Sequence, residues 1–376
     1  GTTAGVVQNN TGSGNSVLNN SGTVTGPSAI SATLTGGFYT LNNLAAGTLN
    51  GSVNVTGSAL GTSNFSNAGI WNASGASAFN GSWANSGTTN VANAATINVA
   101  GPSVNNSSGV IRFAGNGTLA TNLTNAGLID ARNGTAGQLI TLTGNYIGDG
   151  QIGLDASVGT NTADRLAISG TATGTSTVLI NVLSQGVLPT GFLPLVTVGT
   201  GTPAINAFSS APLPTTGLFT ESFGLNPANA TQFGINQTLN PSSTQLSQLS
   251  TVAGSVSVML DEPVSALITD RTDRKTQFGV WGRGSIGDFN QNLSTSFVSP
   301  GFSTSVTQKV RESYYVLQTG LDFGLLGVGG GPLNLHFGVT GGHYNASVKV
   351  PGGVSHVDTD VLGGYLAVTG AGLSID

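Results

Sequence analysis

The first part of the chain places single apolar residues between short polar runs, and the pattern recurs along the sequence. An Asn-x-Gly signature, usually followed by apolar residues, begins at Asn20, Asn67, Asn85 and Asn125, with a longer variant from Asn106 to Gly109. The steps between successive glycines are 18, 22 and 18 residues, for Gly69, Gly87, Gly109 and Gly127. Irregular steps of about 20 residues are typical of one turn of a three-sided parallel β-solenoid, whose short strands stack turn upon turn.

Asn and Gly at the corners of such a coil have a physical reason. Gly, and Asn to a lesser degree, tolerate the positive φ that a sharp corner between strands needs, and stacked Asn side chains can form hydrogen-bonded ladders. The predicted structural residues are therefore Asn67, Gly69, Asn85, Gly87, Gly109, Asn125 and Gly127. The alternative is a flexible, low-complexity linker. Regularly placed large apolar residues argue against a linker, because they need a core: Trp71, Phe79, Trp83, Ile97 and Phe113.

Composition narrows the function further. Residues 1–111 contain no Asp, Glu, Lys, Arg or His, and Arg112 is the first ionisable side chain. A catalytic site usually needs a titratable group, an activated nucleophile or a metal cage, so the sequence predicts no enzyme, no cofactor and no metal. Only Arg112, Arg132 and Arg165 are basic before residue 271, which argues against nucleic-acid binding. The classes of function that remain are presentation of a surface, adhesion and assembly.

From about residue 138 the chain changes to alternating strands. It reads G-N-Y-I-G-D-G over 144–150, A-D-R-L-A-I-S-G over 163–170, T-V-L-I-N-V over 177–182 and L-V-T-V over 195–198. This order resembles the C-terminal end of a type V autotransporter passenger. The resemblance implies a right-handed β-helix, with a passenger over 1–137 and autochaperone-like turns over 138–235. Asp164, Arg165 and Leu166 match the family's D-R-L position, where we expect a buried or capping ion pair rather than catalysis.

A helix is predicted next, within a linker over 236–275. Pro241 is a helix-entry signal, and Pro263 kinks or ends the helix. One apolar stripe at spacings of three and four follows Pro241: Leu246, Leu249, Val252, Ala253 and Val256. By the resemblance, this is the helix that threads a translocator pore.

Residues 276–376 alternate with a period of two and predict about four strands. Apolar residues that alternate with polar ones or Gly fit transmembrane β-strands around a wet lumen, although a soluble sandwich alternates in the same way. The first strand, with Trp281, is similar to the opening strand of autotransporter barrels. Those barrels have twelve strands, and open edges are not tolerated in hydrocarbon. We therefore expect a fragment, or a sheet that closes by pairing with something else.

Other chemical motifs are weak. Gly282–Gly287 is a formal G-x-G-x-x-G, but no helix signal follows it. Ser355, His356 and Asp358 are too close in an extended loop to align as a triad. His336 and His343 are seven apart, on opposite faces of a strand, and are a poor metal pair. For a hydrolase or lyase on the solenoid, the only carboxylate candidates are Asp130, Asp149 and Asp155.

The sequence therefore predicts an all-β chain: a right-handed parallel β-helix, a short helical linker and an incomplete antiparallel β-barrel sheet. The predicted function is a surface-displayed or secreted passenger with an adhesive or structural role, attached to an outer-membrane translocator module of a Gram-negative cell. The partners that the resemblance implies are the outer membrane and its barrel-assembly machinery. The alternative is an extracellular fibre formed by self-association of stacked solenoids. The ligand stays open.

Overall fold

The computed structural model describes residues 4–57, 63–214, 218–240, 276–299, 302–350, 353–370 and 373–375. They belong to two compact units, divided near residue 239, and each unit is described by itself. The helix predicted after Pro241 lies outside the described residues.

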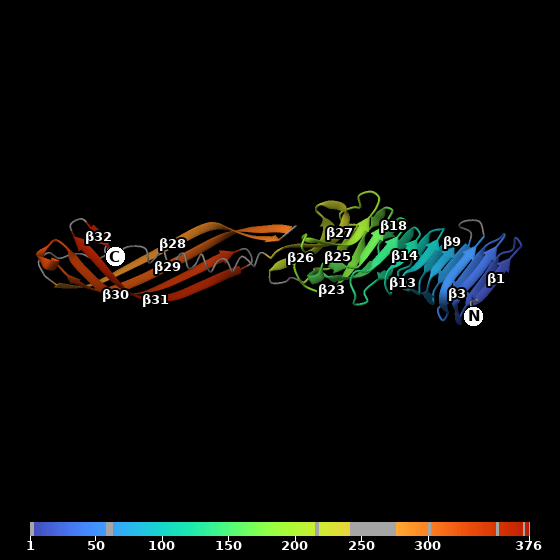
Figure 1. The fold of residues 1–376 in the computed structure, drawn as a ribbon, viewed down its shortest axis with the longest axis horizontal. Helices are drawn as coiled ribbons and strands as arrows, with labels where there is room; N and C mark the ends of the chain where they lie inside the picture. Colours follow the sequence, from blue (N-terminus) through green and yellow to red (C-terminus); the bar gives the residue numbers. More distant parts are fainter. Residues whose placement is uncertain are drawn as a thin grey trace. The chain divides into compact units, whose positions relative to one another are not determined.

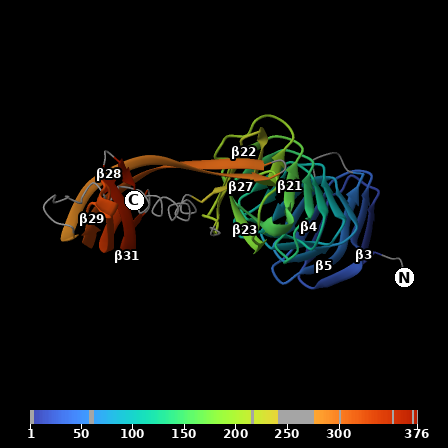
Figure 2. The same ribbon diagram turned by 60° about the vertical axis from the view of Figure 1, so that its left-hand side comes forward.

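The first unit is a parallel β-solenoid of about eight turns. One complete turn consists of β7 (Ile70–Ala73), β8 (Ala76–Phe79) and β9 (Gly81–Asn85). Its three strands pair in parallel with β10 (Thr88–Val91), β11 (Ala95–Val99) and β12 (Ser103–Asn105) of the next turn. Figures 1 and 2 show the successive turns, coloured from blue to green, wound around a common core. The predicted solenoid is confirmed.

One side of the solenoid is an eight-stranded sheet with one strand per turn. Besides β9 and β12 it contains β2 (Ser16–Asn20), β4 (Tyr39–Asn43), β6 (Ser63–Asn67), β15 (Leu123–Asn125), β18 (Tyr146–Gly148) and β22 (Ala172–Gly174). The other sides share a larger sheet, whose further strands are β1 (Val6–Asn10), β3 (Thr23–Leu34), β5 (Thr48–Thr56), β13 (Val110–Phe113), β14 (Gly117–Ala120), β16 (Leu128–Asp130), β17 (Leu139–Leu142), β19 (Gln151–Ser157), β20 (Thr162–Ala163), β21 (Arg165–Ile168), β23 (Ser176–Ser184), β24 (Phe192–Val198), β25 (Phe208–Ser210), β26 (Phe219–Asn226) and β27 (Asn229–Leu239). A single 3₁₀ turn, η1 (Val158–Thr160), follows β19.

In most strands of the solenoid alternate residues are buried, and their apolar side chains form one continuous core, as the period of a strand requires. All five large residues that the sequence assigned to a core are buried: Trp71, Phe79, Trp83, Ile97 and Phe113. Trp71 packs edge-to-face on Phe65 and on Trp83, with ring centroids 5.0 and 5.8 Å apart. Buried aromatic pairs of this geometry add about 1 kcal/mol each to the gain from burial itself.

The stack continues without a break through residue 138, because β17 pairs in register with β14. At the far end β24 pairs in parallel with β21 and in antiparallel with β27, which changes the strand direction. The linker is predicted from residue 236, and β27 runs into that range as far as Leu239. The reason is that Ile235, Gln237 and Leu239 continue the inward-facing alternation.

The second unit is an antiparallel sheet in the order β28-β29-β30-β31-β32. Its strands are β28 (Thr276–Ser299), β29 (Phe302–Leu325), β30 (Asn334–Val350), β31 (Gly353–Gly370) and the short β32 (Leu373–Ile375). A 3₁₀ turn, η4 (Val328–Gly330), lies between β29 and β30. The described part of this sheet thus has four long strands, as the alternation predicted, and a short fifth one.

Candidate functional site

Six asparagines, one per turn, form a ladder of hydrogen bonds inside the solenoid. In every step the side-chain Nδ2 donates to the Oδ1 of the next asparagine at 2.8 Å, along Asn20, Asn43, Asn67, Asn85, Asn105 and Asn125. Each Nδ2 also donates to a backbone carbonyl of the following turn. Asn125 then donates to the Tyr146 hydroxyl at 3.2 Å, and this hydroxyl shares a hydrogen bond with the Ser176 hydroxyl at 2.9 Å. The buried amides are therefore satisfied in both directions.

This ladder confirms the predicted Asn stacking but places it inside the coil. The sequence pattern found Asn20, Asn67, Asn85 and Asn125 and missed Asn43 and Asn105. In these two turns the corner glycine follows the asparagine by four residues instead of two, as at Asn105 and Gly109. Asn106, taken as the motif residue, is only half-buried and donates to the Ser86 hydroxyl at 2.7 Å. The sequence pattern does not contain the strand register, and it is the register that aligns Asn105 with Asn85.

The corner glycines serve close packing of turns, which corrects the predicted reason for them. None of Gly69, Gly87, Gly109 and Gly127 has a positive φ. A Cβ on Gly69, Gly87 or Gly127 would lie 2.2 Å from a glycine carbonyl oxygen of the previous turn, and one on Gly109 would lie 2.3 Å from Asn105 Oδ1. These contacts are far below any real Cβ distance, so only glycine fits where the stacked corners meet.

At the family-like D-R-L position, Asp164 and Leu166 are buried, whereas Arg165 is exposed. Asp164 accepts the backbone N–H of Gln138 and of Asp155, both at 2.9 Å. The predicted ion pair between Asp164 and Arg165 does not form, because neighbouring residues in extended backbone point to opposite faces. The Asp164 carboxylate is held by backbone amides instead of by an arginine.

A second buried carboxylate lies beside Asp164. Asp155 accepts the N–H groups of Asn133 and Gly134 at 2.8 and 2.7 Å, and the side-chain amide of Asn181 at 2.6 Å. Together the two aspartates hold the connection between β16 and β17, where the sequence texture changes. Burial raises the pKa of Asp164 above its ordinary value; hydrogen bonds from the backbone oppose this, and the charge of Asp155 adds to it.

The raised pKa of Asp164 gives a pH dependence of stability. The pKa of Asp164 is 3.8 in the unfolded chain and higher in the folded protein, so folding favours the protonated carboxyl. The contribution of this group to the free energy of unfolding is therefore complete below pH 3.8, and it is lost as the pH rises through the folded pKa. We expect the unfolding free energy of the wild type to increase relative to Asp164→Asn on acidification across this window. Urea unfolding followed by circular dichroism, at neutral pH and stepwise down to pH 3.8, measures it; a constant difference between the two proteins would contradict the assignment.

The first charged side chains of the chain line a cleft of about 470 Å³ on the outside of the solenoid. It crosses β7, β10, β13 and β16. On its floor a column of outward side chains runs in register through Asn72, Asn90, Arg112 and Asp130. Asn90 donates to Asn72 at 2.7 Å, and Arg132 donates to both carboxylate oxygens of Asp130, at 2.7 and 3.3 Å. The sequence marked Arg112 only as the first ionisable residue and did not predict this cleft.

The two faces of the C-terminal sheet differ sharply in chemistry. One face exposes large apolar side chains, among them Phe278, Val280, Ile286, Leu317, Leu321, Phe323, Phe337, Val339, Leu362 and Leu366. The opposite face buries polar and charged side chains, namely Glu312, Gln318, Asp322, His336 and Thr340, beside Trp281 and Tyr344 and a group of smaller apolar residues, Val310, Val316, Ala346 and Val348. A water-soluble sheet has the reverse arrangement.

The buried polar side chains bond to one another across the strands. Asp322 accepts from the Tyr365 hydroxyl at 3.0 Å and lies 2.9 Å from His336 Nδ1, and Trp281 Nε1 donates to Tyr365 at 3.0 Å. Nearby, Arg283 donates to Gln318 at 2.8 Å. Trp281, predicted as a structural residue of the first strand, anchors this network.

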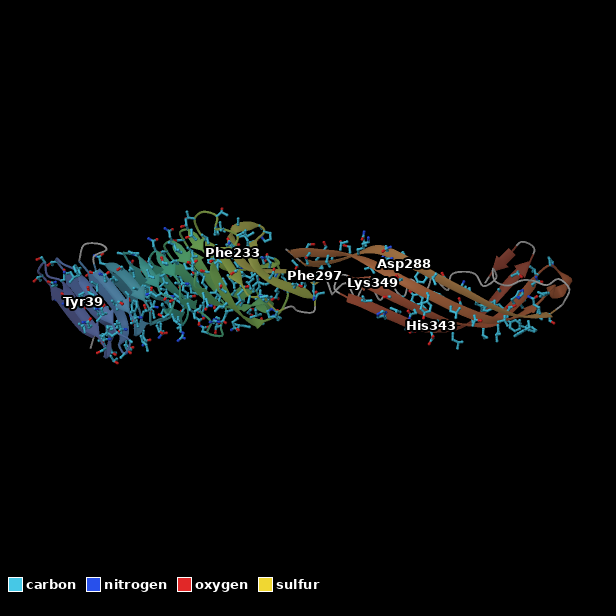
Figure 3. The ribbon with its side chains drawn as sticks, turned by 180° about the vertical axis from the view of Figure 1, so that it is seen from behind. Tyr39, Phe233, Asp288, Phe297, His343 and Lys349 are labelled. Atoms are coloured by element: carbon cyan, nitrogen blue, oxygen red, sulfur yellow. The ribbon has the colours of Figure 1, made fainter. Side chains whose placement is uncertain are left out.

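The apolar face ends along a slanted line. Tyr315 and Leu317 on β29 lie directly opposite Asn345 and His343 on β30. His343 in turn lies opposite Asp360 on β31, and its ring Nδ1 is 2.9 Å from the Asp360 carboxylate. Beyond this line the same face is mainly polar: it includes Arg311, Ser347 and Lys349, with Val354 as an exposed apolar exception opposite Lys349. Figure 3 labels Asp288, His343 and Lys349 on strands of this sheet, and Tyr39 and Phe233 in the early and late parts of the solenoid.

The other candidate motifs do not assemble. Ser355 and His356 are adjacent in strand β31 rather than in a loop, so they point to opposite faces. His336 is buried and His343 is partly exposed, as their odd spacing predicted. Gly282–Gly287 lies inside strand β28. In the described part of the chain no group of three His, Cys, Asp or Glu residues could hold a metal. No described helix is long and apolar enough to cross a membrane.

Asp130, Asp149 and Asp155, the carboxylates considered for hydrolysis, each have a separate partner. Asp130 pairs with Arg132, Asp149 accepts the N–H of Thr175 at 3.3 Å, and Asp155 holds the loop described above.

Comparison with known proteins adds no closer assignment. No protein-family model matches the sequence, and no curated protein is detectably similar to it. The class that the structure defines is an all-β protein built on a β-solenoid of about eight turns.

Proposed function

We propose that this chain is a β-helical passenger of the type V autotransporter kind, attached to strands of an outer-membrane barrel and displayed at a Gram-negative cell surface. Its role is adhesive or structural. The outer membrane and the barrel-assembly machinery are its expected partners. The right-handed coil and the helical linker of the family belong to this proposal.

The observation that carries the proposal is the inverted C-terminal sheet. Its solvent-exposed face is largely apolar and its buried face contains a network of polar and charged side chains, which suits strands with hydrocarbon outside and a wet lumen inside. On β29 the outward-facing apolar side chains extend from Tyr315 to Phe323, a span of nine residues, which is about the length of a tilted transmembrane strand. The slanted boundary of the face is expected for strands that tilt relative to the membrane.

The solenoid supports the adhesive or structural part of the proposal. Residues 1–111 carry no ionisable side chain, and the buried carboxylates Asp155 and Asp164 of the later turns are held by backbone amides. A long stack of paired strands presents a large, regular surface instead of an enclosed reaction site.

Vesicle flotation tests the membrane part. The full chain is refolded in the presence of vesicles of phosphatidylethanolamine and phosphatidylglycerol and floated on a density gradient. Leu321 and Val339 are paired on the apolar face, so replacing both by Arg is expected to reduce the floated fraction at least tenfold. Each Arg near the membrane centre costs about 2–4 kcal/mol.

Ser347→Arg is the matched control, because Ser347 lies on the same face of β30 but beyond the apolar region. It should float like the wild type. A wild-type chain that does not float, or a double variant that floats equally well, would rule out a lipid-facing sheet.

The second candidate is a self-assembling extracellular fibre. It is favoured by the lack of charge through residue 111, because stacked solenoids would experience little electrostatic repulsion. Electron microscopy of the purified chain separates the two: long regular polymers favour the fibre, and detergent-soluble monomers favour the membrane module.

A further inference from the structure

We infer that the cleft around Arg112 is a binding groove for an extended acidic glycan, whose carboxylate is received by the Arg112 guanidinium. This deepens the adhesive part of the proposed function by naming a ligand class and a site. It rests on four features of the groove: its length, the unused hydrogen-bonding groups of its floor, its charge and its closed backbone edges.

The groove is long and regular. It crosses four adjacent strands, so at about 4.8 Å per strand its floor extends roughly 14 Å along the solenoid. Its volume of about 470 Å³ is that of an ordinary ligand site. A polar side chain stands at each step, at Asn72, Asn90, Arg112 and Asp130. An evenly spaced row of this kind matches a linear polymer of similar units better than a single compact molecule.

The polar groups in the centre of the row are available. In the described structure Arg112 makes no hydrogen bond or ion pair, and the Oδ1 of Asn90 accepts no hydrogen bond. The Nδ2 of Asn90 uses one of its two hydrogens, on Asn72. A planar guanidinium beside a planar amide offers donors and an acceptor in fixed directions, which suits a sugar carboxylate and its neighbouring hydroxyls.

Arg132 and Asp130 close one end of the row. Their bidentate pair lies over Gly153 of β19, where a Cβ would come within 2.4 Å of both Arg132 Nε and Asp130 Oδ1. Because Arg132 is neutralised by Asp130, Arg112 is the free cation in the groove, which therefore favours an anion of low charge density.

Other classes of macromolecule fit less well. The strands of the floor, β7, β10 and β13, are paired on both edges, so a peptide could not add to them as another strand. A nucleic acid needs several cations along its backbone, and this groove has a single free one. A glycan with spaced carboxylates requires neither an open strand edge nor several cations.

Titration of the full chain with defined oligosaccharides tests the inference. The probes are a galacturonic acid hexamer and a hyaluronan hexasaccharide, with neutral maltohexaose for comparison, measured by calorimetry at low and high salt. We expect an acidic probe to bind at least about tenfold more tightly than the neutral one and to weaken with salt, as a charge-assisted contact should. No binding of either acidic probe overturns the inference.

Variants locate the site. Arg112→Gln removes the free cation from an exposed position and should weaken binding about tenfold, whereas Arg165→Gln, an exposed arginine of the same solenoid outside the groove, should not. Asp130→Asn frees Arg132 and should strengthen binding of the acidic probe. If the Arg112 and Arg165 variants bind the acidic oligosaccharide equally well, Arg112 is not part of its site. If an acidic peptide or duplex DNA competes as well as the oligosaccharide itself, the site is not specific for a glycan. Vesicle flotation does not involve Arg112, so its outcome is separate from this one.

Discussion

Asn85→Leu is expected to lower the unfolding free energy of the solenoid by about 3–6 kcal/mol. Asn85 is the middle of the buried ladder: its Oδ1 accepts from Asn67 and Thr89, and its Nδ2 donates to Asn105. Leucine has nearly the same size, so the change removes the polar groups without leaving a large cavity. The groups left without partners are buried, and each costs about 1–3 kcal/mol.

The measurement is urea unfolding of the full chain, followed by the fluorescence of the tryptophans. Hydrogen exchange read by mass spectrometry, over peptides from 63 to 113, then assigns the change to the solenoid. Trp71 and Trp83 lie within two turns of the substitution and are buried, so their emission reports on this region. Exchange is expected to accelerate first in the turns of Asn67, Asn85 and Asn105.

Asn90→Leu is the matched control. Asn90 belongs to a second row of stacked amides, with a hydrogen bond of 2.7 Å to Asn72, but this row faces outward. Water can replace the lost partner there, so the expected change is within about 0.5 kcal/mol. If the two variants are equally stable, the buried ladder does not hold the turns together.

The repeat could be found in the sequence because the chain marks each turn twice, with an asparagine and with a glycine. The marks are reliable where the corner has its short form, as at Asn67 and Gly69. They fail where the corner is longer, so Asn43 and Asn105 were missed. Which of two neighbouring asparagines points inward depends on the strand register, and a spacing of residues in one turn does not determine that.

The cleft was beyond sequence reasoning for a related reason. Asn72, Asn90, Arg112 and Asp130 are separated by 18, 22 and 18 residues, and become neighbours only because the turns stack in register. The buried roles of Asp155 and Asp164 were hidden in the same way, since their partners are backbone amides of another turn. The two faces of the C-terminal strands, by contrast, could be predicted from the sequence, because alternate residues of a strand point to opposite faces.

Gly87→Ala is expected to destabilise the solenoid by about 3 kcal/mol or more. The added Cβ would lie 2.2 Å from the carbonyl oxygen of Gly69 and 2.6 Å from that of Ala68. Both are backbone atoms, so relief requires the two turns to move apart. That movement would stretch the hydrogen bonds from Gly87 N to Asn67 O and from Thr88 N to Gly69 O, both 2.9 Å. Overpacking of a closed site typically costs 1–3 kcal/mol before such bonds are lost.

Gly22→Ala provides the comparison within the same column of corners. Gly22 also accepts a stacking hydrogen bond, from Thr48 N at 2.8 Å, but a Cβ there meets no atom within 4 Å, and its φ is not positive. Alanine should therefore be neutral or slightly stabilising, because it restricts the unfolded chain. Urea unfolding of both variants decides the point. If Gly87→Ala were as stable as Gly22→Ala, the corner glycines would not be required by close stacking, and the spacing that first indicated a solenoid would need another physical cause.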